Sequence, residues 1–99
     1  MTNSVLSGTL LDDQVTVSMT EICVACACRS EWIVELVAEG VLEPLQEERD
    51  EYYFSADSLL TAQAAQRLQR DLGVNIEGVA LVLDLLDEIK SLRAKLQRL

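Results

Sequence analysis

Three cysteines lie close together at Cys23, Cys26 and Cys28, and thiols at such spacings can bind zinc or exchange disulfides. A structural zinc site needs four ligands, whereas the chain has three cysteines and no histidine. On a helix Cys23 and Cys26 share one face while Cys28 points elsewhere, and free cysteine is commonly buried. We therefore interpret the three as small buried hydrophobic side chains in a reducing compartment and predict no metal site. A redox or metal sensor is the alternative, and it would have to recruit carboxylates or a second subunit as ligands.

Acidic residues near the C-terminus form a second candidate for chemistry. On a helix Asp84 lies one turn before Asp87 and Glu88, so their carboxylates could face one another and bind a cation. A solvated helix face explains the same pattern, and we favour it. The absence of histidine removes the commonest general base, and the chain has no glycine-rich phosphate loop and no Ser-His-Asp arrangement. The sequence therefore predicts a protein that is not an enzyme and needs no cofactor.

The composition indicates a small, acidic, globular protein. The 99 residues carry a net charge of -9, with a pI near 4.3, and 49% of them are hydrophobic. Such acidity disfavours nucleic acid and anionic membranes as partners and favours proteins with a basic surface. No apolar run reaches the roughly 20 residues that span a bilayer, and the N-terminal residues do not resemble a signal peptide. We therefore expect a cytoplasmic protein with a loose lead-in over residues 1–13.

The first half of the chain predicts a helix-turn-helix. Alternating polar and apolar residues over 14–19 predict a strand, and Thr20 is placed to cap a short helix that ends near Arg29. Ser30 is placed to cap a second helix, which ends at Gly40 in a left-handed conformation. The inward positions of this second helix are Ile33, Leu36 and Val37.

The second helix presents three glutamates along one face, Glu31, Glu35 and Glu39, which we call the acidic ridge. Proteins grip DNA mainly with lysine and arginine, so the acidic ridge would repel a duplex. Like charges four residues apart also cost stability, and Trp32 lies beside the acidic ridge, off the predicted core face. An exposed tryptophan flanked by acids is typical of a binding site for a basic protein, so we predict that the acidic ridge and Trp32 contact a partner. A solvated surface without a partner is the alternative.

The residues that follow predict a β-hairpin wing and a third helix. Residues 45–54 run through a charged turn, which indicates a hairpin with a charged tip. Ser55 is placed to cap a helix that runs to Leu72 and ends at Gly73. Residues 14–74 are therefore expected to form a winged helix-turn-helix. The residues of the third helix that are expected to face inward are Leu59, Leu60, Ala64, Leu68 and Leu72.

A long C-terminal helix is predicted over residues 75–99, as part of the same domain. Its apolar positions alternate spacings of three and four, which is the a/d pattern of a coiled coil. We call these positions the seam and expect them to join two copies of the chain, with Glu88 and Arg93 pairing across a parallel homodimer. Docking into a groove of another protein, and packing of Val82 and Leu85 into the protomer's own core, are the alternatives. The seam consists of Val82, Leu85, Ile89, Leu92, Leu96 and Leu99. A second stripe, expected to pack against the rest of the domain, consists of Val79, Leu83 and Leu86.

The order of these elements resembles that of the MerR-type winged helix-turn-helix proteins. The matching stretches are 15–26, 33–44 and 53–60. Members of that group usually carry an arginine in the second helix and another in the wing, and the matching positions here hold Val34 and Tyr52. The resemblance therefore implies a mainly α fold with a small β-hairpin wing and a long C-terminal helix, from which the DNA contacts have been lost.

The chaperone modulators of the CbpM type are the branch of this superfamily that fits the loss of these two arginines. The segments that carry the resemblance are Thr20-Glu21-Ile22-Cys23, Gly40-Val41-Leu42-Glu43-Pro44 and Asp71-Leu72-Gly73-Val74-Asn75 with the helix after it. Proteins of this type bind the J-domain of a DnaJ-like or CbpA-like co-chaperone and block its stimulation of the Hsp70 (DnaK) ATPase. The resemblance implies the same function here, and a J-domain that docks on Hsp70 through a basic helix would complement the acidic ridge.

A dimeric MerR-like transcriptional regulator is the main alternative function. Arg67, Arg70 and the basic end of the C-terminal helix would then supply positive charge for DNA. That basic end also complements the negative end of its own helix dipole, so it needs no nucleic acid to explain it. The basic end carries Lys90, Arg93, Lys95 and Arg98.

Overall fold

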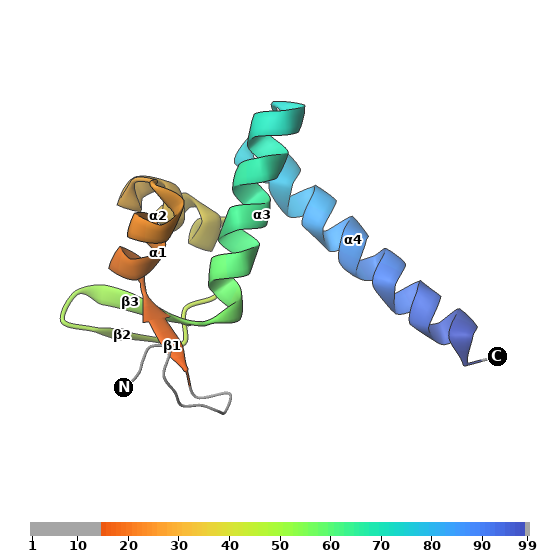
Figure 1. Ribbon diagram of the computed structural model, residues 1–99, viewed down its shortest axis with the longest axis horizontal. Helices are drawn as coiled ribbons and strands as arrows, with labels where there is room; N and C mark the ends of the chain where they lie inside the picture. The colour runs from red at the N-terminus through yellow and green to blue at the C-terminus, as the bar shows by residue number, and fades with distance from the viewer. Residues whose placement is uncertain (1–14, 99) are drawn as a thin grey trace.

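The computed structural model describes residues 15–98, which form a mainly helical fold with one small sheet and a long C-terminal helix (Figure 1). This is the predicted fold class. Residues 1–14 and Leu99, which include the predicted lead-in and the last residue of the seam, lie outside the described residues. The elements are, in chain order, β1 (Thr16–Ser18), α1 (Met19–Cys26), α2 (Ser30–Ala38), β2 (Gln46–Glu48), β3 (Glu51–Ser55), α3 (Asp57–Leu72) and α4 (Ile76–Gln97).

The wing and the first strand form one antiparallel sheet in the order β1-β3-β2. Strands β2 and β3 make the wing, and Val17 of β1 lies opposite Phe54 on the other edge of β3. The two residues between β2 and β3 both have positive φ, 54° at Arg49 and 64° at Asp50, as a two-residue type I′ hairpin turn requires. The predicted hairpin with a charged tip is confirmed, and β1 connects it directly to the helix-turn-helix.

Helices α1 and α2 form the helix-turn-helix, but neither is capped by the residue that the sequence predicted. Ser18 caps α1: its hydroxyl accepts a hydrogen bond from the Glu21 N–H at 3.0 Å, and the Glu21 carboxylate accepts one from the Ser18 N–H at 2.7 Å. Thr20 lies inside the helix instead, because this reciprocal capping box satisfies two backbone donors where a lone threonine cap satisfies one. Ser30 is the first residue of α2, after Arg29, whose side chain makes no capping bond.

The core lies where α1, α2 and β3 meet the middle of α3 and the start of α4. Ile33 and Leu36 of α2 are fully buried, as predicted, and Val37 is half-buried. Helix α2 is followed by Gly40 with φ 77°, the predicted left-handed residue, and the chain then folds back so that the Val41 N–H donates to the Leu36 carbonyl at 2.8 Å. The buried hydrophobic residues are Ile22, Cys26, Ile33, Leu36, Leu42, Phe54, Ala62, Ala65, Ile76 and Val79.

Helix α3 presents only part of the predicted face to the core: Leu59 and Leu68 are half-buried against it, as expected. Its buried residues are Ser58, Ala62 and Ala65, whereas Leu60 is 66% exposed and Leu72 is 61% exposed. The prediction followed the leucines, but α3 packs against α1 and β3 as well as α4, and small side chains allow this close approach on several sides. The cap prediction was also wrong: Ser55 is the last residue of β3, and the residue before α3 is Ala56, without a side-chain cap. The helix ends at the left-handed Gly73, as predicted.

Helix α4 leaves the body of the domain after its first turns (Figure 1). Its N-cap is Asn75, whose side chain accepts from the Gly78 N–H at 2.8 Å, and Val79 is buried. From Asp84 to Arg98 every residue is exposed. At about 1.5 Å per residue its 22 residues extend about 33 Å. The radius of gyration, 15.0 Å, accordingly exceeds the roughly 13 Å expected for a compact chain of this length. None of the helices in the described part of the chain combines the length and apolar composition that crossing a bilayer requires.

Candidate protein-binding surface

The acidic ridge lies along the solvent-facing side of α2. Glu31 and Glu35 lie on α2, Glu39 is the residue directly after its end, and all three are exposed; α2 itself contains no lysine or arginine. Arg29 lies just before α2, and its Nε lies 3.9 Å from the Glu31 Oε1, with both side chains largely in solvent. An exposed pair at this distance neutralises little charge. The ridge therefore presents net negative charge to any approaching molecule.

Trp32 does not stand free beside the acidic ridge, and the prediction of an exposed tryptophan was wrong. The side chain is half-buried and packs against the core. Its indole N–H donates to the Gln69 Oε1 of α3 at 2.8 Å, and the Gln69 Nε2 donates to the Val74 carbonyl at 3.1 Å. An indole this large reaches Gln69 of α3 even though its position on α2 lies to one side of the core face. Trp32 therefore positions α2 on α3, whereas Val34, the other residue placed off the core, is 48% exposed.

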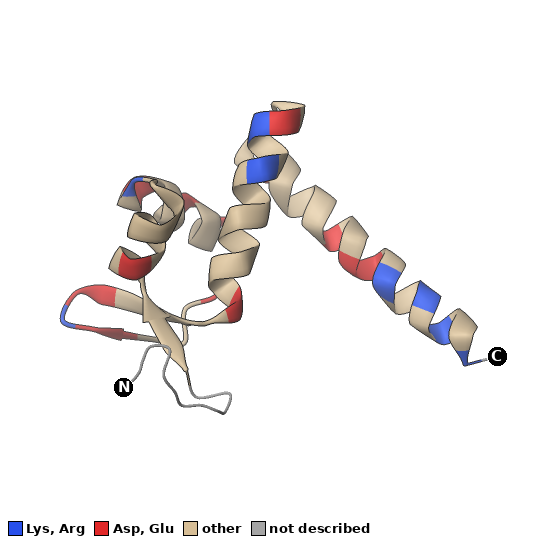
Figure 2. Cartoon of the chain, in the orientation of Figure 1, with Lys and Arg blue, Asp and Glu red and all other residues tan. Residues whose placement is uncertain are grey.

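The wing beside the helix-turn-helix is acidic as well (Figure 2). Strand β2 carries Glu47 and Glu48 in solvent, and Arg49 is the wing's only basic residue. Glu51 is tied to α1, since its Oε2 accepts from the Thr20 N–H at 2.7 Å, and the hydrogen bonds from Thr20 lower the pKa of this carboxyl. The surfaces that would meet DNA in a winged helix-turn-helix are therefore negative on both α2 and the wing.

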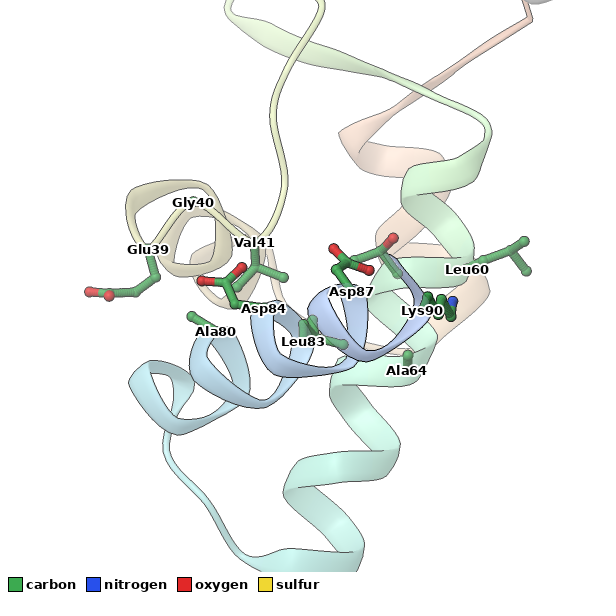
Figure 3. A pocket seen from close by; sticks show the side chains of 11 residues that line it. Glu39, Gly40, Val41, Leu60, Ala64, Ala80, Leu83, Asp84, Asp87 and Lys90 are labelled. Atoms are coloured by element: carbon green, nitrogen blue, oxygen red, sulfur yellow. The ribbon is translucent and has the colours of Figure 1, made fainter. Parts of the chain in front are cut away.

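A groove opens between the end of α2, α3 and α4, with a volume of about 360 Å³ (Figure 3). The groove depends on the angle at which α4 leaves α3, which no pattern in the sequence specifies. The signal available beforehand was the pair Asp84 and Asp87, interpreted above as a solvated helix face. The lining residues are Glu39, Gly40, Val41, Leu60, Thr61, Ala64, Ala80, Leu83, Asp84, Asp87 and Lys90.

Most of the seam lies in solvent. The exposed fractions are 54% for Leu85, 44% for Ile89, 50% for Leu92 and 67% for Leu96, and Val82 is half-buried. Packing of Leu85 into the protomer's own core, one of the alternatives, is therefore excluded. The second stripe serves the domain only at its start, since Val79 is buried, Leu83 is half-buried against the core and Leu86 is 45% exposed.

The cysteines line the inner side of α1 and the turn after it. Cys26 is buried in the core, as predicted, while Cys23 and Cys28 are half-buried. Burial and the neighbouring Cys23 raise the pKa of the Cys26 thiol, and the same causes raise the pKa of Cys28 to about 12. The thiols of Cys26 and Cys28 thus stay protonated at neutral pH, which disfavours nucleophilic or metal-binding chemistry. Over residues 15–98, no three cysteine, aspartate or glutamate side chains converge in a way that would hold a metal ion.

Comparison with known proteins identifies the family. The model of the MerR HTH family regulatory proteins matches residues 17–99. The chain is 32% identical to the chaperone modulatory protein CbpM of Pseudomonas entomophila strain L48 over 90 residues, which cover 91% of this chain and 86% of the relative. It is 31% identical to the chaperone modulatory protein CbpM of Coxiella burnetii strain Dugway 5J108-111 over 99 residues, which cover 100% of this chain and 93% of the relative. The chain has a MerR-type helix-turn-helix with an acidic second helix, and its relatives match it along nearly its full length. The chain therefore belongs to the CbpM family of chaperone modulatory proteins.

Proposed function

We propose that this protein binds the J-domain of a DnaJ-like or CbpA-like co-chaperone and thereby prevents that J-domain from stimulating the ATPase of Hsp70. The family supplies the chaperone system as the setting, because the relatives are chaperone modulatory proteins. The exposed acidic surface supports the proposed mode of action, which is occlusion of a basic helix. A J-domain engages Hsp70 through a basic helix, and a protein that covers this helix blocks the engagement by occlusion.

The observation that carries the proposal is the exposed acidic ridge on α2. Glu31, Glu35 and Glu39 stand in solvent on the helix that a DNA-binding relative would present to the duplex. Complementary charge speeds the encounter of two proteins and selects among partners, so a chain with net charge -9 favours a basic target. The same ridge, together with the acidic wing, opposes the alternative of DNA binding, since a duplex would meet like charge on both elements.

The test is a calorimetric titration with the J-domain co-chaperone of the same organism, paired with a DnaK ATPase assay. We expect the wild-type chain to bind and to suppress the stimulated ATPase. The double variant Glu31→Lys, Glu35→Lys should weaken binding by about tenfold or more, because it reverses two charges at the contact. Circular dichroism should stay unchanged, since both side chains are in solvent.

A matched control separates the position of the charges from their number. The variant Glu47→Lys, Glu48→Lys makes the same change in net charge on β2, away from α2. We expect it to reduce the association rate modestly and the affinity by less than the α2 variant. An equal loss in both variants would show that only net charge matters and would contradict the assignment to the ridge. No binding by the wild-type chain at low salt would overturn the proposed function.

We also propose that the seam joins two copies of the chain along α4. The supporting observation is the run of exposed apolar side chains from Leu85 to Leu96 on a helix that extends beyond its own domain. The charges along α4 bear on the orientation (Figure 2), because its first part is acidic and its second part basic. Antiparallel helices would place each acidic part beside the partner's basic part, which favours an antiparallel pair over the parallel one expected from Glu88 and Arg93 alone.

A further inference from the structure

The groove between α2, α3 and α4 combines an apolar floor with acidic walls. Val41, Ala64 and Leu83 supply apolar surface, and Leu60 of α3 extends it at one end, 66% exposed. A contiguous apolar surface, rather than a single exposed leucine, is what marks an interaction site, and Leu60 counts here because it adjoins the other apolar lining residues. The groove is partly open to solvent, and its volume of about 360 Å³ is large enough for one or two side chains of another molecule.

The acidic walls are not neutralised by the protein itself. Asp84 and Asp87 line the α4 side, and Glu39 lines the end of α2 (Figure 3). Lys90 also borders the groove, but within residues 15–98 neither aspartate forms an ion pair with a lysine or arginine. The balance of charge at the groove is therefore negative, and it complements a positive side chain.

The groove and the seam lie on opposite sides of α4. At about 100° per residue, Ile89 of the seam is about 180° around the helix from Ala80 and about 140° from Asp84, both of which line the groove. A second copy of the chain packed along the seam would therefore leave the groove open. The groove is therefore available to a different protein even when the seam is covered.

We infer that this groove receives a basic amphipathic segment of the J-domain partner, as a second contact beside the acidic ridge. An apolar side chain of that segment would sit on the floor between Leu60 and Leu83, and flanking lysine or arginine side chains would pair with Asp84 and Asp87. Glu39 is common to the ridge and the groove, so the two surfaces are continuous and one partner can cover both. This inference rests on the proposed function and adds the site that takes the partner's apolar side chain.

Two single substitutions with matched controls on the same helices test the inference. Leu60→Ser should raise the Kd for the co-chaperone about tenfold, because it removes a leucine that the complex buries, while Leu72→Ser changes an equally exposed leucine of α3 outside the groove. Asp87→Lys should raise the Kd about fivefold to tenfold, and Glu88→Lys makes the same charge change one position away from the lining. We expect both controls to stay within about twofold of the wild-type chain.

The outcomes separate this inference from the proposed function. If the wild-type chain binds and the double variant of the acidic ridge loses affinity, while Leu60→Ser and Asp87→Lys bind like the wild-type chain, the groove is not a contact and the proposed function stands. If the wild-type chain does not bind, both fail. Equal losses in the groove variants and in their controls would also reject the groove. Because all four side chains are exposed, circular dichroism and the urea midpoint should confirm that each variant folds.

Discussion

Gln69 holds three parts of the fold together through one amide side chain. It accepts the Trp32 indole N–H from α2 and donates to the Val74 carbonyl in the turn between α3 and α4. Gln69→Ala leaves a half-buried donor and a carbonyl without their partner, so we expect the free energy of unfolding to fall by about 1 to 3 kcal/mol. Urea unfolding followed by tryptophan fluorescence measures this loss.

A control on the same helix is Gln63→Ala. Gln63 is also half-buried on α3, but its side chain makes no hydrogen bond within the described residues. We expect a change of about 0.5 kcal/mol or less. Losses of similar size in the two variants would mean that the amide network does not contribute to stability.

Glu51 makes the stability of the fold depend on pH in the acid range. Its hydrogen bonds from Thr20 lower the pKa of the carboxyl in the folded state, so the folded state binds this proton less tightly than the unfolded state does. The contribution is therefore present above the unfolded pKa of about 4.3 and is lost as the pH falls through the lower folded value. We expect Glu51→Gln to flatten the acid limb of a plot of unfolding free energy against pH. Glu47→Gln, on the neighbouring strand, should leave that limb unchanged.

At the level of single residues, the sequence predicted which side chains are buried better than it predicted which side chains contact one another. Ile33, Leu36 and Cys26 are buried as expected, because hydrophobic type and helical phase together determine which side faces in. Trp32 was misplaced because phase alone ignores the length of the side chain. Its partner Gln69 lies far away in the sequence, and no local pattern indicates that contact.

Two turns hold a residue with positive φ, and this backbone conformation costs energy in one turn but not in the other. Asp50 at the wing tip has φ 64°, a conformation that costs energy for a residue with a side chain, whereas Gly73 after α3 has φ 69° at no such cost. We expect Asp50→Gly to stabilise the protein by about 0.5 to 1 kcal/mol and Gly73→Ala to destabilise it by about 1 kcal/mol. Thermal unfolding of both variants checks the two opposite signs, and a shift in the same direction would contradict the assignment of backbone strain.

At the level of elements, the order and type of every helix and the hairpin followed from periodicity and turn residues. The helix starts did not, because several polar residues compete for each cap. Ser18 rather than Thr20 caps α1, because it forms reciprocal hydrogen bonds with Glu21. Helix α3 begins without any side-chain cap. The buried face of α3 was predicted only in part, since Ala62 and Ala65 are buried and Leu59 and Leu68 pack beside them, whereas Leu60 and Leu72 turn outward.

The whole molecule ends in a helix whose residues from Asp84 to Arg98 are all exposed. Truncation after Ile89 removes the last eight residues of α4, and every described residue that it removes is exposed. We therefore expect the shortened chain to fold and to sediment as a monomer at concentrations where the full chain is a dimer. Sedimentation equilibrium gives the mass of each form. An identical mass for the two chains would reject the seam as the dimer contact.

The groove shows where prediction from sequence ended. Its lining comes from α3, α4 and the turn that follows α2, and only the angle between α3 and α4 brings Leu60 near Asp87. Val79 and Leu83 of α4 pack into and against the core. The helical pattern indicated that these residues face inward, but it did not give the angle between α4 and α3. Periodicity identifies which face of a helix is apolar, and the tertiary fold determines what that face meets.

The projecting helix α4 has a consequence for how affinity is measured. A dimer joined along the seam carries one acidic ridge at each end, so a co-chaperone that is itself paired would be held at two points by one modulator. The second attachment would then occur at an effective concentration set by the spacing of the two ends rather than by the concentration in solution. Binding constants measured with an isolated J-domain would accordingly understate retention by the intact co-chaperone. The truncated chain, as a monomer, would lose that gain in avidity while keeping the acidic ridge and the groove aspartates, although it also loses Lys90 at the edge of the groove.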